Sequence, residues 1–286
     1  MKICRFNENH IGVVEGRNVQ DVSVALNSIK TPTWPQPPGD LIIANLANLT
    51  GEFHKLRRTA ETLSLRDITL NSPVARPSKI IGAPVNYRLH QKEVNADKEI
   101  SPSGGVKDIE TYGLFLKSPV PVGPDEGVRL GFEARRTDHE VELAIVIGET
   151  CRNVIEEDAL DYVAGYTIGL DMTVRGTEDR SLRKAIDSHS VLGPWIVTTN
   201  EITNPDNLEI SLSVNGKTKQ QSNTSHMIYS TRKLISFASS FYTLYPGDVI
   251  MSGTPEGVGP VSAGDILECV IESIGSMRVP IRASWA

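Results

Sequence analysis

Residues 139–148 of the 286-residue chain form an apolar run that carries two acidic residues near its start. This stretch is rich in β-branched residues and closes on a glycine, which predicts a β-strand with side chains on two alternating faces. Glu140 and Glu142 then share one face, with their carboxylates roughly 7 Å apart at the strand rise. The opposite face would carry Val141, Leu143, Ile145 and Ile147. Two acids therefore stand side by side on an otherwise apolar element.

This acidic pair has two interpretations. Two neighbouring carboxyl groups in a low-dielectric cleft resist ionisation unless a cation balances their charge. Glu140 and Glu142 therefore fit a hard divalent ion such as Mg²⁺ or Mn²⁺. Alternatively, the strand faces solvent and carries two ordinary glutamates. The strand by itself leaves both interpretations open.

A second apolar run, residues 164–173, predicts a strand that ends near Asp171. Hard-metal sites commonly collect oxygen ligands from different strands, so Asp171 is a candidate third ligand. Arg175, Glu178 and Lys184 follow in one charged segment. A cation there is suited to anchor a substrate carboxylate beside a metal, although a solvated helix with charge pairs would show the same pattern.

Upstream, residues 79–90 predict a buried strand that runs into a Gly/Pro/Asn loop and then a helical turn. His90 and Glu93 are three residues apart and share a face of that turn, so Glu93 would orient His90 as a general base. A surface histidine with an incidental neighbour is the alternative. Residues 95–110 are polar and contain Gly, Ser and Pro, which suggests a loop that closes over a site.

The other elements are expected to serve as scaffold. In residues 1–75 the pattern predicts a small separate unit with two short strands (2–6 and 11–16) and helices at 19–26 and 41–49. Further on it predicts a helix at 156–163, a strand at 208–216 with an Asn-Gly hairpin turn, and a helix at 231–244. Residues 248–259 form a strand that enters a Gly/Pro loop, whose amides and Thr254 hydroxyl are suited to receive a carboxylate.

Composition narrows the class of protein. Hydrophobic residues make up 39% of the chain and charged residues 22%, with a net charge of −6, which is typical of a globular protein and argues against nucleic-acid or anionic-membrane partners. Three cysteines without CxxC spacing predict neither a disulfide framework nor a structural zinc site. The polar N-terminus and the lack of long apolar runs lead us to expect a cytoplasmic location.

Five motifs together resemble the fumarylacetoacetate hydrolase family, in family order and over roughly residues 78–286. They are NYRLHQKE (86–93), FLKSP (115–119), DHEVELAIVIG (138–148), GYTIGLDMTVR (165–175) and GDVIMSGTPEGVG (247–259). QQSNTSHMIYS (220–230) extends the match. The combination is far more specific than any pair of acids, and it favours the metal interpretation of Glu140, Glu142 and Asp171.

The resemblance implies a mainly β, α+β fold, with a small N-terminal domain (1–75), a catalytic domain of rolled mixed β-sheets (76–286) and a homodimer. It also implies that Glu140, Glu142 and Asp171 hold Mg²⁺ or Mn²⁺, which the 2-oxo acid unit of a small-molecule substrate chelates. In such a hydrolase, the pair of His90 and Glu93 would activate water. The resemblance further implies that Lys184 stabilises the oxyanion, that the metal stabilises the departing pyruvate enolate, and that the substrate contacts are Tyr87, Arg175, Glu178 and Thr254.

The chain departs from the family pattern in the segment between Asp171 and Lys184. Many members carry Gln where this chain has Glu178, and the segment is shorter than in many relatives. Arg175 therefore has Glu178 as an expected partner in competition with substrate.

Three functions remain. The first is metal-dependent hydrolysis of a C–C bond in an acylpyruvate-like 2,4-dioxo acid, because the pattern supplies a base and an oxyanion partner beside a metal. The second is decarboxylation or isomerisation of 2-oxo or 2-hydroxydienoic acids, because the same metal-stabilised enolate serves those reactions. The third is a non-catalytic, metal-dependent binding module.

Overall fold

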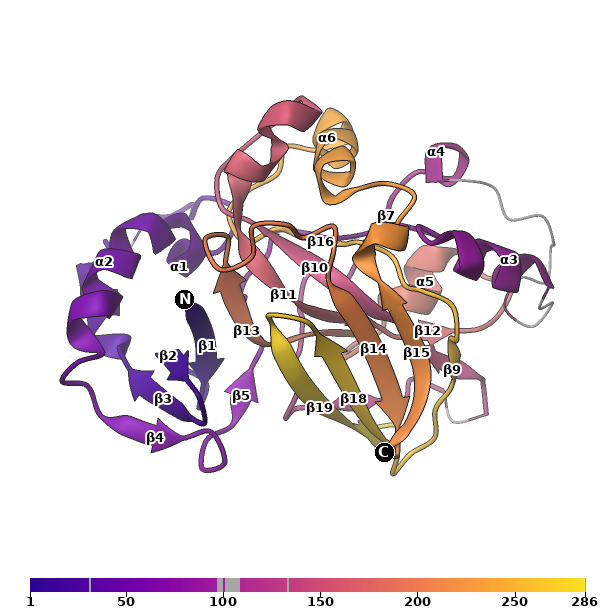
Figure 1. Ribbon diagram of the computed structural model, residues 1–286, viewed down its shortest axis with the longest axis horizontal. Helices are drawn as coiled ribbons and strands as arrows, with labels where there is room; N and C mark the ends of the chain where they lie inside the picture. Colours follow the sequence, from indigo (N-terminus) through magenta and orange to yellow (C-terminus); the bar gives the residue numbers. More distant parts are fainter. Residues whose placement is uncertain (31, 97–99, 101–108, 133, 286) are drawn as a thin grey trace.

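The computed structural model describes residues 1–30, 32–96, 100, 109–132 and 134–285 (Figure 1). Within these residues the largest sheet has eleven strands in the order β4-β3-β2-β1-β13-β11-β10-β16-β6-β7, with β5 paired to β1. Its strands are β1 (Lys2–Phe6), β2 (His10–Glu15), β3 (Asn18–Asp21), β4 (Thr62–Ser64), β5 (Leu70–Asn71), β6 (Ile80–Gly82), β7 (Phe115–Lys117), β10 (Val141–Ile147), β11 (Val163–Asp171), β13 (Ser190–Thr198) and β16 (Val249–Met251). All its pairings are antiparallel except β16 with β6.

Two smaller sheets and short helices complete the described part of the chain. One sheet has the order β15-β14-β18-β19-β8 and the other β12-β9-β17. Their strands are β8 (Val128–Arg129), β9 (Thr137–His139), β12 (Thr173–Val174), β14 (Glu209–Val214), β15 (Lys217–Asn223), β17 (Gly259–Pro260), β18 (Ile266–Ile271) and β19 (Gly275–Arg282). The helices are α1 (Leu41–Ala44), α2 (Leu46–Leu56), α3 (Arg88–Ala96), α4 (Ile109–Tyr112), α5 (Arg180–Lys184) and α6 (Thr231–Phe241), with 3₁₀ turns at Ser23–Ser28, Glu156–Tyr162 and Thr224–His226. Mixed sheets with few helices confirm the predicted fold class.

Strand β10 is buried on both faces, which explains its apolar composition. Its odd-numbered residues Val141–Ile147 enter the main core together with residues of β14, β18, β19 and α6. Ala144 and Val146 face the other way and pack in a second cluster with Ile80 and Val249. The predicted alternation of side chains along β10 is therefore confirmed. Glu142 lies on the same face of the strand as Ala144 and Val146.

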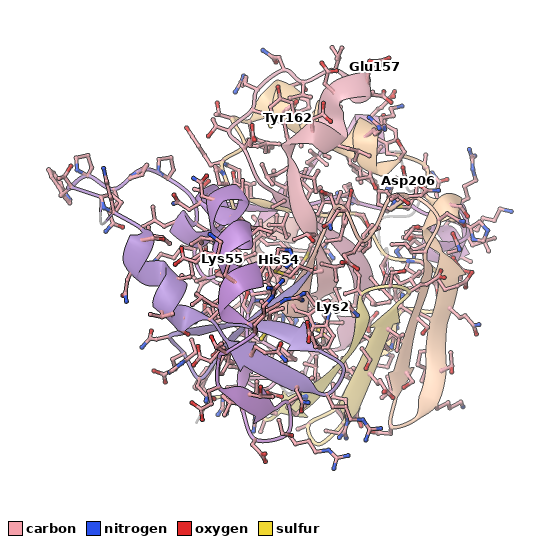
Figure 2. The ribbon with its side chains drawn as sticks, turned by 60° about the vertical axis from the view of Figure 1, so that its left-hand side comes forward. Lys2, His54, Lys55, Glu157, Tyr162 and Asp206 are labelled. Atoms are coloured by element: carbon pink, nitrogen blue, oxygen red, sulfur yellow. The ribbon has the colours of Figure 1, made fainter. Side chains whose placement is uncertain are left out.

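The N-terminal strands extend the large sheet. Strand β1 pairs with β13, with Ile3 opposite Ile196, and β2 to β4 follow outward. Helix α2 packs on these strands in a separate apolar cluster that includes Ile3, Val13 and Phe53. Figure 2 labels His54 on α2 and Tyr162, the residue before β11. Both residues line a cavity of about 470 Å³. The predicted domain boundary at residue 75 stays a prediction.

The pattern of apolar residues predicts several elements incorrectly. The helix expected at 19–26 is wrong, because Val19 pairs with Val14 and Leu63 in the sheet and a 3₁₀ turn follows. Residues 156–162 form a 3₁₀ helix, and α6 ends at Phe241 rather than at residue 244. The Asn215-Gly216 hairpin is confirmed, with positive φ at both residues.

The proposed lid at 95–110 lies largely outside the described residues. Among the helices that are described, none is both long and apolar enough to cross a membrane.

Candidate active site

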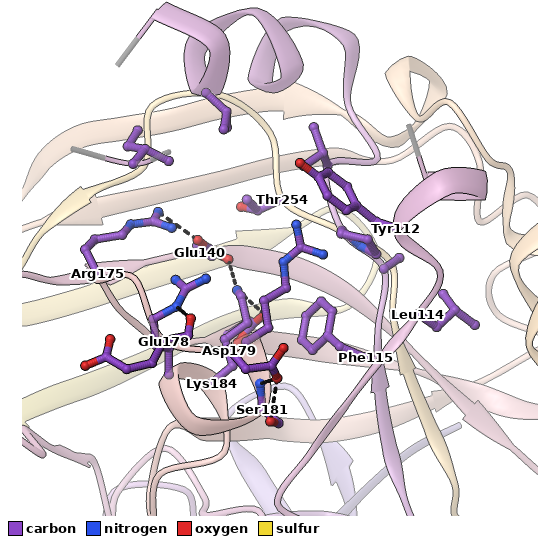
Figure 3. A pocket seen from close by; sticks show the side chains of 18 of the residues that line it. Tyr112, Leu114, Phe115, Glu140, Arg175, Glu178, Asp179, Ser181, Lys184 and Thr254 are labelled. Atoms are coloured by element: carbon purple, nitrogen blue, oxygen red, sulfur yellow. Dashed lines mark hydrogen bonds and ion pairs between the residues drawn. The ribbon is translucent and has the colours of Figure 1, made fainter. Parts of the chain in front are cut away.

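A cavity of about 700 Å³ lies where α3, α5 and β7 meet the ends of β10 and β11 (Figure 3). Four of the predicted site residues that line it are acidic or basic groups near its floor: Glu140, Glu142, Asp171 and Lys184. His90, Arg175, Glu178 and Thr254 line it as well. The structure therefore brings together most of the residues that the sequence singled out.

Glu140, Glu142 and Asp171 form one buried cluster at the cavity floor. Glu140 occupies the break between β9 and β10, and its carbonyl accepts a hydrogen bond from the Asp171 amide at 2.8 Å. One carboxylate oxygen from each residue lies within 4.8 Å of the others. The three residues are 5%, 2% and 0% exposed, which excludes the solvent-facing interpretation. Three hard oxygen donors in this arrangement fit Mg²⁺ or Mn²⁺.

Two buried lysines balance this cluster. Lys184 Nζ donates to Glu140 Oε2 at 2.6 Å, to Asp171 Oδ2 at 2.7 Å and to Thr173 Oγ1 at 2.6 Å. These bonds occupy all three of its protons. Lys117 Nζ donates to Asp171 Oδ1 and, at 2.5 Å, to the Lys184 carbonyl. Sequence reasoning assigned no role to Lys117, although a single charge within an apolar strand was a usable signal.

The two glutamates of the cluster differ in their ionisation. Burial raises the pKa of Glu142 well above its usual value, and the negative charge of Asp171 adds to the rise. Burial also opposes ionisation of Glu140, but the neighbouring Lys184 and Arg175 outweigh it and lower the pKa of Glu140 to about 2. Glu142 is therefore the carboxylate of the cluster at which a proton would compete with a bound metal ion.

This competition predicts that Mn²⁺ binding releases a proton. Because the pKa of Glu142 is raised, the metal-free protein holds a proton there below that pKa, and affinity for Mn²⁺ should weaken as the pH falls. We expect a loss of about tenfold per pH unit in that range, for one proton exchanged. Calorimetric titrations in two buffers of different ionisation enthalpy measure the proton directly. A pH-independent affinity without proton release would contradict the prediction.

Two glycine amides fix the acidic side chains from the loop after β16. Gly253 N donates to Glu142 Oε2 at 2.7 Å, and Gly257 N donates to Glu93 Oε1 at 3.0 Å. Gly253 has a φ of 94°, and a Cβ there would lie 2.6 Å from the Asn86 side chain. This position therefore requires glycine, and the loop supplies amides where a larger residue would not fit.

His90 and Glu93 form a hydrogen-bonded pair on α3, as predicted. His90 is 5% exposed, and its Nδ1 lies 2.8 Å from Glu93 Oε2. The carboxylate accepts the Nδ1 proton, which leaves the lone pair on Nε2 free to take up another proton. Since Gly257 holds the second oxygen of Glu93, the imidazole has a fixed orientation at the cavity wall.

The expected pairing of Arg175 with Glu178 is wrong. Arg175 instead donates to Asp138 at 2.8 Å and to Glu140 at 2.9 Å, while Glu178 forms a two-pronged ion pair with Arg135. The reason is spatial: the carboxylate of Asp138 projects from β9, which pairs with the β12 strand just before Arg175. Figure 3 shows the bond from Arg175 to Glu140.

The structure does not bring every predicted substrate contact to the cavity. Tyr87 is 1% exposed and lies outside the cavity lining. Thr254 lines the cavity, but its hydroxyl donates to the Val141 carbonyl at 2.9 Å and accepts from Gln220 Nε2 at 2.8 Å. Gln220 also accepts a hydrogen bond from the Val141 amide at 3.2 Å, so this buried amide holds the start of β10 in place.

Comparison with known proteins shows the family to which the chain belongs. The model of the fumarylacetoacetate (FAA) hydrolase C-terminal domain matches residues 79–282. A maleylpyruvate hydrolase from Aquipseudomonas alcaligenes is 52% identical over 286 residues, which cover 99% of this chain and 100% of that protein. The chain belongs to the fumarylacetoacetate hydrolase family.

Solved structures extend the comparison to the fold. A maleylpyruvate hydrolase from Sphingobium sp. SYK-6, in complex with manganese(II) and pyruvate, is 36% identical with a TM-score of 0.84, over 100% of both chains. A 2-hydroxyhepta-2,4-diene-1,7-dioate isomerase from Mycobacterium marinum is 28% identical with a TM-score of 0.72, also over 100% of both chains. Hydrolases and isomerases thus share this architecture.

Proposed function

We propose that this protein is a Mg²⁺- or Mn²⁺-dependent hydrolase that cleaves a C–C bond of an acylpyruvate, with maleylpyruvate as its substrate. The observation that carries the proposal is the pair of His90 and Glu93, which faces the same cavity as the three-carboxylate cluster. Hydrolysis of a 2,4-dioxo acid needs a base that takes a proton from water. This base must lie beside a site that binds the 2-oxo acid unit. The 52% identical maleylpyruvate hydrolase supports the choice of substrate.

The cluster of Glu140, Glu142 and Asp171 would hold the metal. When bound there, the metal supplies Lewis-acid chemistry, in that it orients and polarises the 2-oxo acid end of the substrate. Arg175 and Lys184 keep Glu140 ionised for this purpose, and Gly253 holds one oxygen of Glu142.

His90 is the proposed base. Its Nε2 takes a proton from water as the water oxygen bonds to the distal acyl carbonyl carbon, and Glu93 stabilises the imidazolium that forms. The bond between that carbon and the adjacent CH₂ then breaks. The electron pair goes to the pyruvate half, which takes up the proton from His90, so that a carboxylic acid and pyruvate leave.

Lys184 is the proposed partner of the oxyanion on the attacked carbonyl. Its three protons already bond to Glu140, Asp171 and Thr173, so a direct bond to the oxyanion requires that one of these partners be exchanged. Its charge acts on the oxyanion even without that exchange, because the lysine is buried and its charge is only weakly screened by water. Thr254 and Arg175 are the proposed substrate contacts at the cavity, and contacts of substrate with Tyr87 and Glu178 stay predictions.

Product analysis tests the proposal. Purified protein with Mn²⁺ should convert maleylpyruvate into equal amounts of pyruvate and the free acid, as followed by NMR. Release of CO₂ or a shifted double bond would favour the decarboxylase or isomerase alternative, to which the isomerase of the same fold lends support. Absence of turnover across a panel of 2-oxo acids would favour the binding module and overturn the proposal.

The proposal includes a homodimer in the cytoplasm. The exposed apolar side chains of Leu116 on β7 and Leu182 on α5 support a subunit contact next to the cavity, since these elements pack together. The free cysteines Cys4, Cys151 and Cys269 fit a reducing compartment. Light scattering should give twice the chain mass of 31.3 kDa, and a mass of 31.3 kDa would contradict the dimer.

A further inference from the structure

Helix α5 carries two arginines into the cavity wall, Arg180 and Arg183. They are three positions apart and share one face of the helix. Arg183 Nε donates to the Glu178 carbonyl at 2.7 Å, and Nη1 lies 3.5 Å from the Val174 carbonyl. Arg180 stacks on the ring of Tyr112 at 4.2 Å. In the described part of the chain, neither guanidinium forms an ion pair with a carboxylate.

The other long cations of the cavity wall are already paired. Lys184 bonds to Glu140 and Asp171, and Arg175 bonds to Asp138 and Glu140. The carbonyl bonds of Arg183 involve Nε and one terminal nitrogen, so the other terminal nitrogen has no partner among the described residues. A planar guanidinium held in this way presents N–H donors suited to a carboxylate.

The acidic residues at the same rim that the structure describes form their hydrogen bonds with groups other than these arginines. Glu178 gives both of its oxygens to Arg135, at 3.0 and 2.8 Å. Asp179 caps α5, and its Oδ1 accepts from the Ser181 amide at 2.8 Å and the Ser181 hydroxyl at 2.6 Å. The arginine pair therefore retains a positive charge that faces the cavity.

Local electrostatics also favour an anion beside Arg183. Burial lowers the pKa of Arg183, and the positive charges of Arg175 and Arg180 lower it further. Like charges gathered in a partly buried site repel one another, and a bound anion relieves that repulsion. The apolar side chains of Leu114 and Phe115 line the same cavity and give a hydrocarbon chain a surface to pack against.

We infer that Arg183, with Arg180 beside it, binds a carboxylate at the far end of the acyl chain of the substrate. The inference rests on the proposed function, because the three-carboxylate cluster has to hold the 2-oxo acid end for the tail to reach α5. It defines the substrate class as acylpyruvates whose acyl group itself ends in a carboxylate. Arg183 is then a specificity-determining residue, separate from the base and the metal ligands.

Kinetics with two matched substrates test this inference. The first is maleylpyruvate, and the second is its analogue with a carboxamide in place of the tail carboxylate. For the wild-type protein we expect kcat/KM to be about 10- to 100-fold higher with the charged tail, as a charge-assisted bond implies. Arg183→Gln should remove most of this preference, mainly through the KM for maleylpyruvate, and Arg183→Lys should retain part of it.

The controls separate the possible outcomes. Arg278→Gln removes an exposed arginine on β19 and should leave the preference unchanged. Arg180→Gln provides a second test should Arg183→Gln fold poorly, and it should reduce the preference in the same direction. If the preference persists in both α5 variants, or if the wild type shows none while hydrolysing both substrates, the inference is overturned and the proposed function stands. If the wild type hydrolyses neither substrate, both fail.

Discussion

Replacement of His90 by Ala is expected to lower kcat for acylpyruvate hydrolysis by about 10²- to 10⁴-fold, the usual contribution of a general base. The imidazole is the group in the cavity whose free nitrogen can accept the proton of water, because Glu93 already holds Nδ1 at 2.8 Å. Steady-state assays of pyruvate release measure the effect. Mn²⁺ affinity of the variant should stay within a few-fold of wild type, because His90 is not among the three clustered carboxylates that would hold the ion.

A matched control distinguishes loss of the base from loss of the fold. His54→Ala removes an exposed histidine on α2, and its turnover should equal that of the wild type. Glu93→Gln should give an intermediate rate, since the amide still orients the imidazole but no longer stabilises its positive charge. Retention of more than a tenth of wild-type turnover by His90→Ala would rule out His90 as the base.

The parts of the site that lie in regular strands were predictable from sequence. Period-two alternation put Glu140 and Glu142 on one side of a strand, and Asp171 at the end of the next buried strand. The antiparallel pairing of β10 with β11 then brings these ends together. The pattern within either strand cannot predict that pairing. The family motifs supplied that step, because they named the three acids as one set.

Long-range polar contacts were not predictable in the same way. The partner of Arg175 was expected to be Glu178, three residues away, but sheet pairing places Asp138 closer. Lys117 reaches Asp171 across 54 positions, and Gly257 reaches Glu93 across 164. Such contacts depend on how separate loops and strands pack, and that information is absent from sequence spacing. For the same reason, the apolar stripe at 19–26 resembled a helix until its pairing with neighbouring strands was known.

The cluster also explains why the site is charged yet buried. Glu140, Glu142 and Asp171 would repel one another strongly if all were ionised without compensation. Lys184 and Lys117 contact Asp171 from two sides, and Arg175 contacts Glu140. Glu142 receives only an amide from Gly253 among the contacts described, which matches its raised pKa. Among the contacts described, Glu142 is thus the carboxylate of the cluster without a cationic partner, and a divalent ion would supply one.

Asp171→Asn is expected to abolish metal-dependent turnover, with at least a 10²-fold loss of Mn²⁺ affinity, more than typical losses from supporting residues. The amide removes a charged ligand, and it leaves Lys117 and Lys184 facing a group that accepts with one oxygen instead of two. Chelation of the wild-type protein should remove activity in the same way. Added Mn²⁺ or Mg²⁺ should restore the chelated wild type but not the variant.

Asp158→Asn is the matched control, because it changes an exposed aspartate in the 3₁₀ helix before β11 and leaves the cluster intact. It should bind Mn²⁺ and turn over substrate as the wild type does, while calorimetry and pyruvate release are measured on both variants. Thermal unfolding of Asp171→Asn separates the two causes of inactivity. A folded variant that still binds Mn²⁺ with wild-type affinity, or a chelated wild type that keeps its turnover, would show that the carboxylate cluster is not the metal site on which catalysis depends.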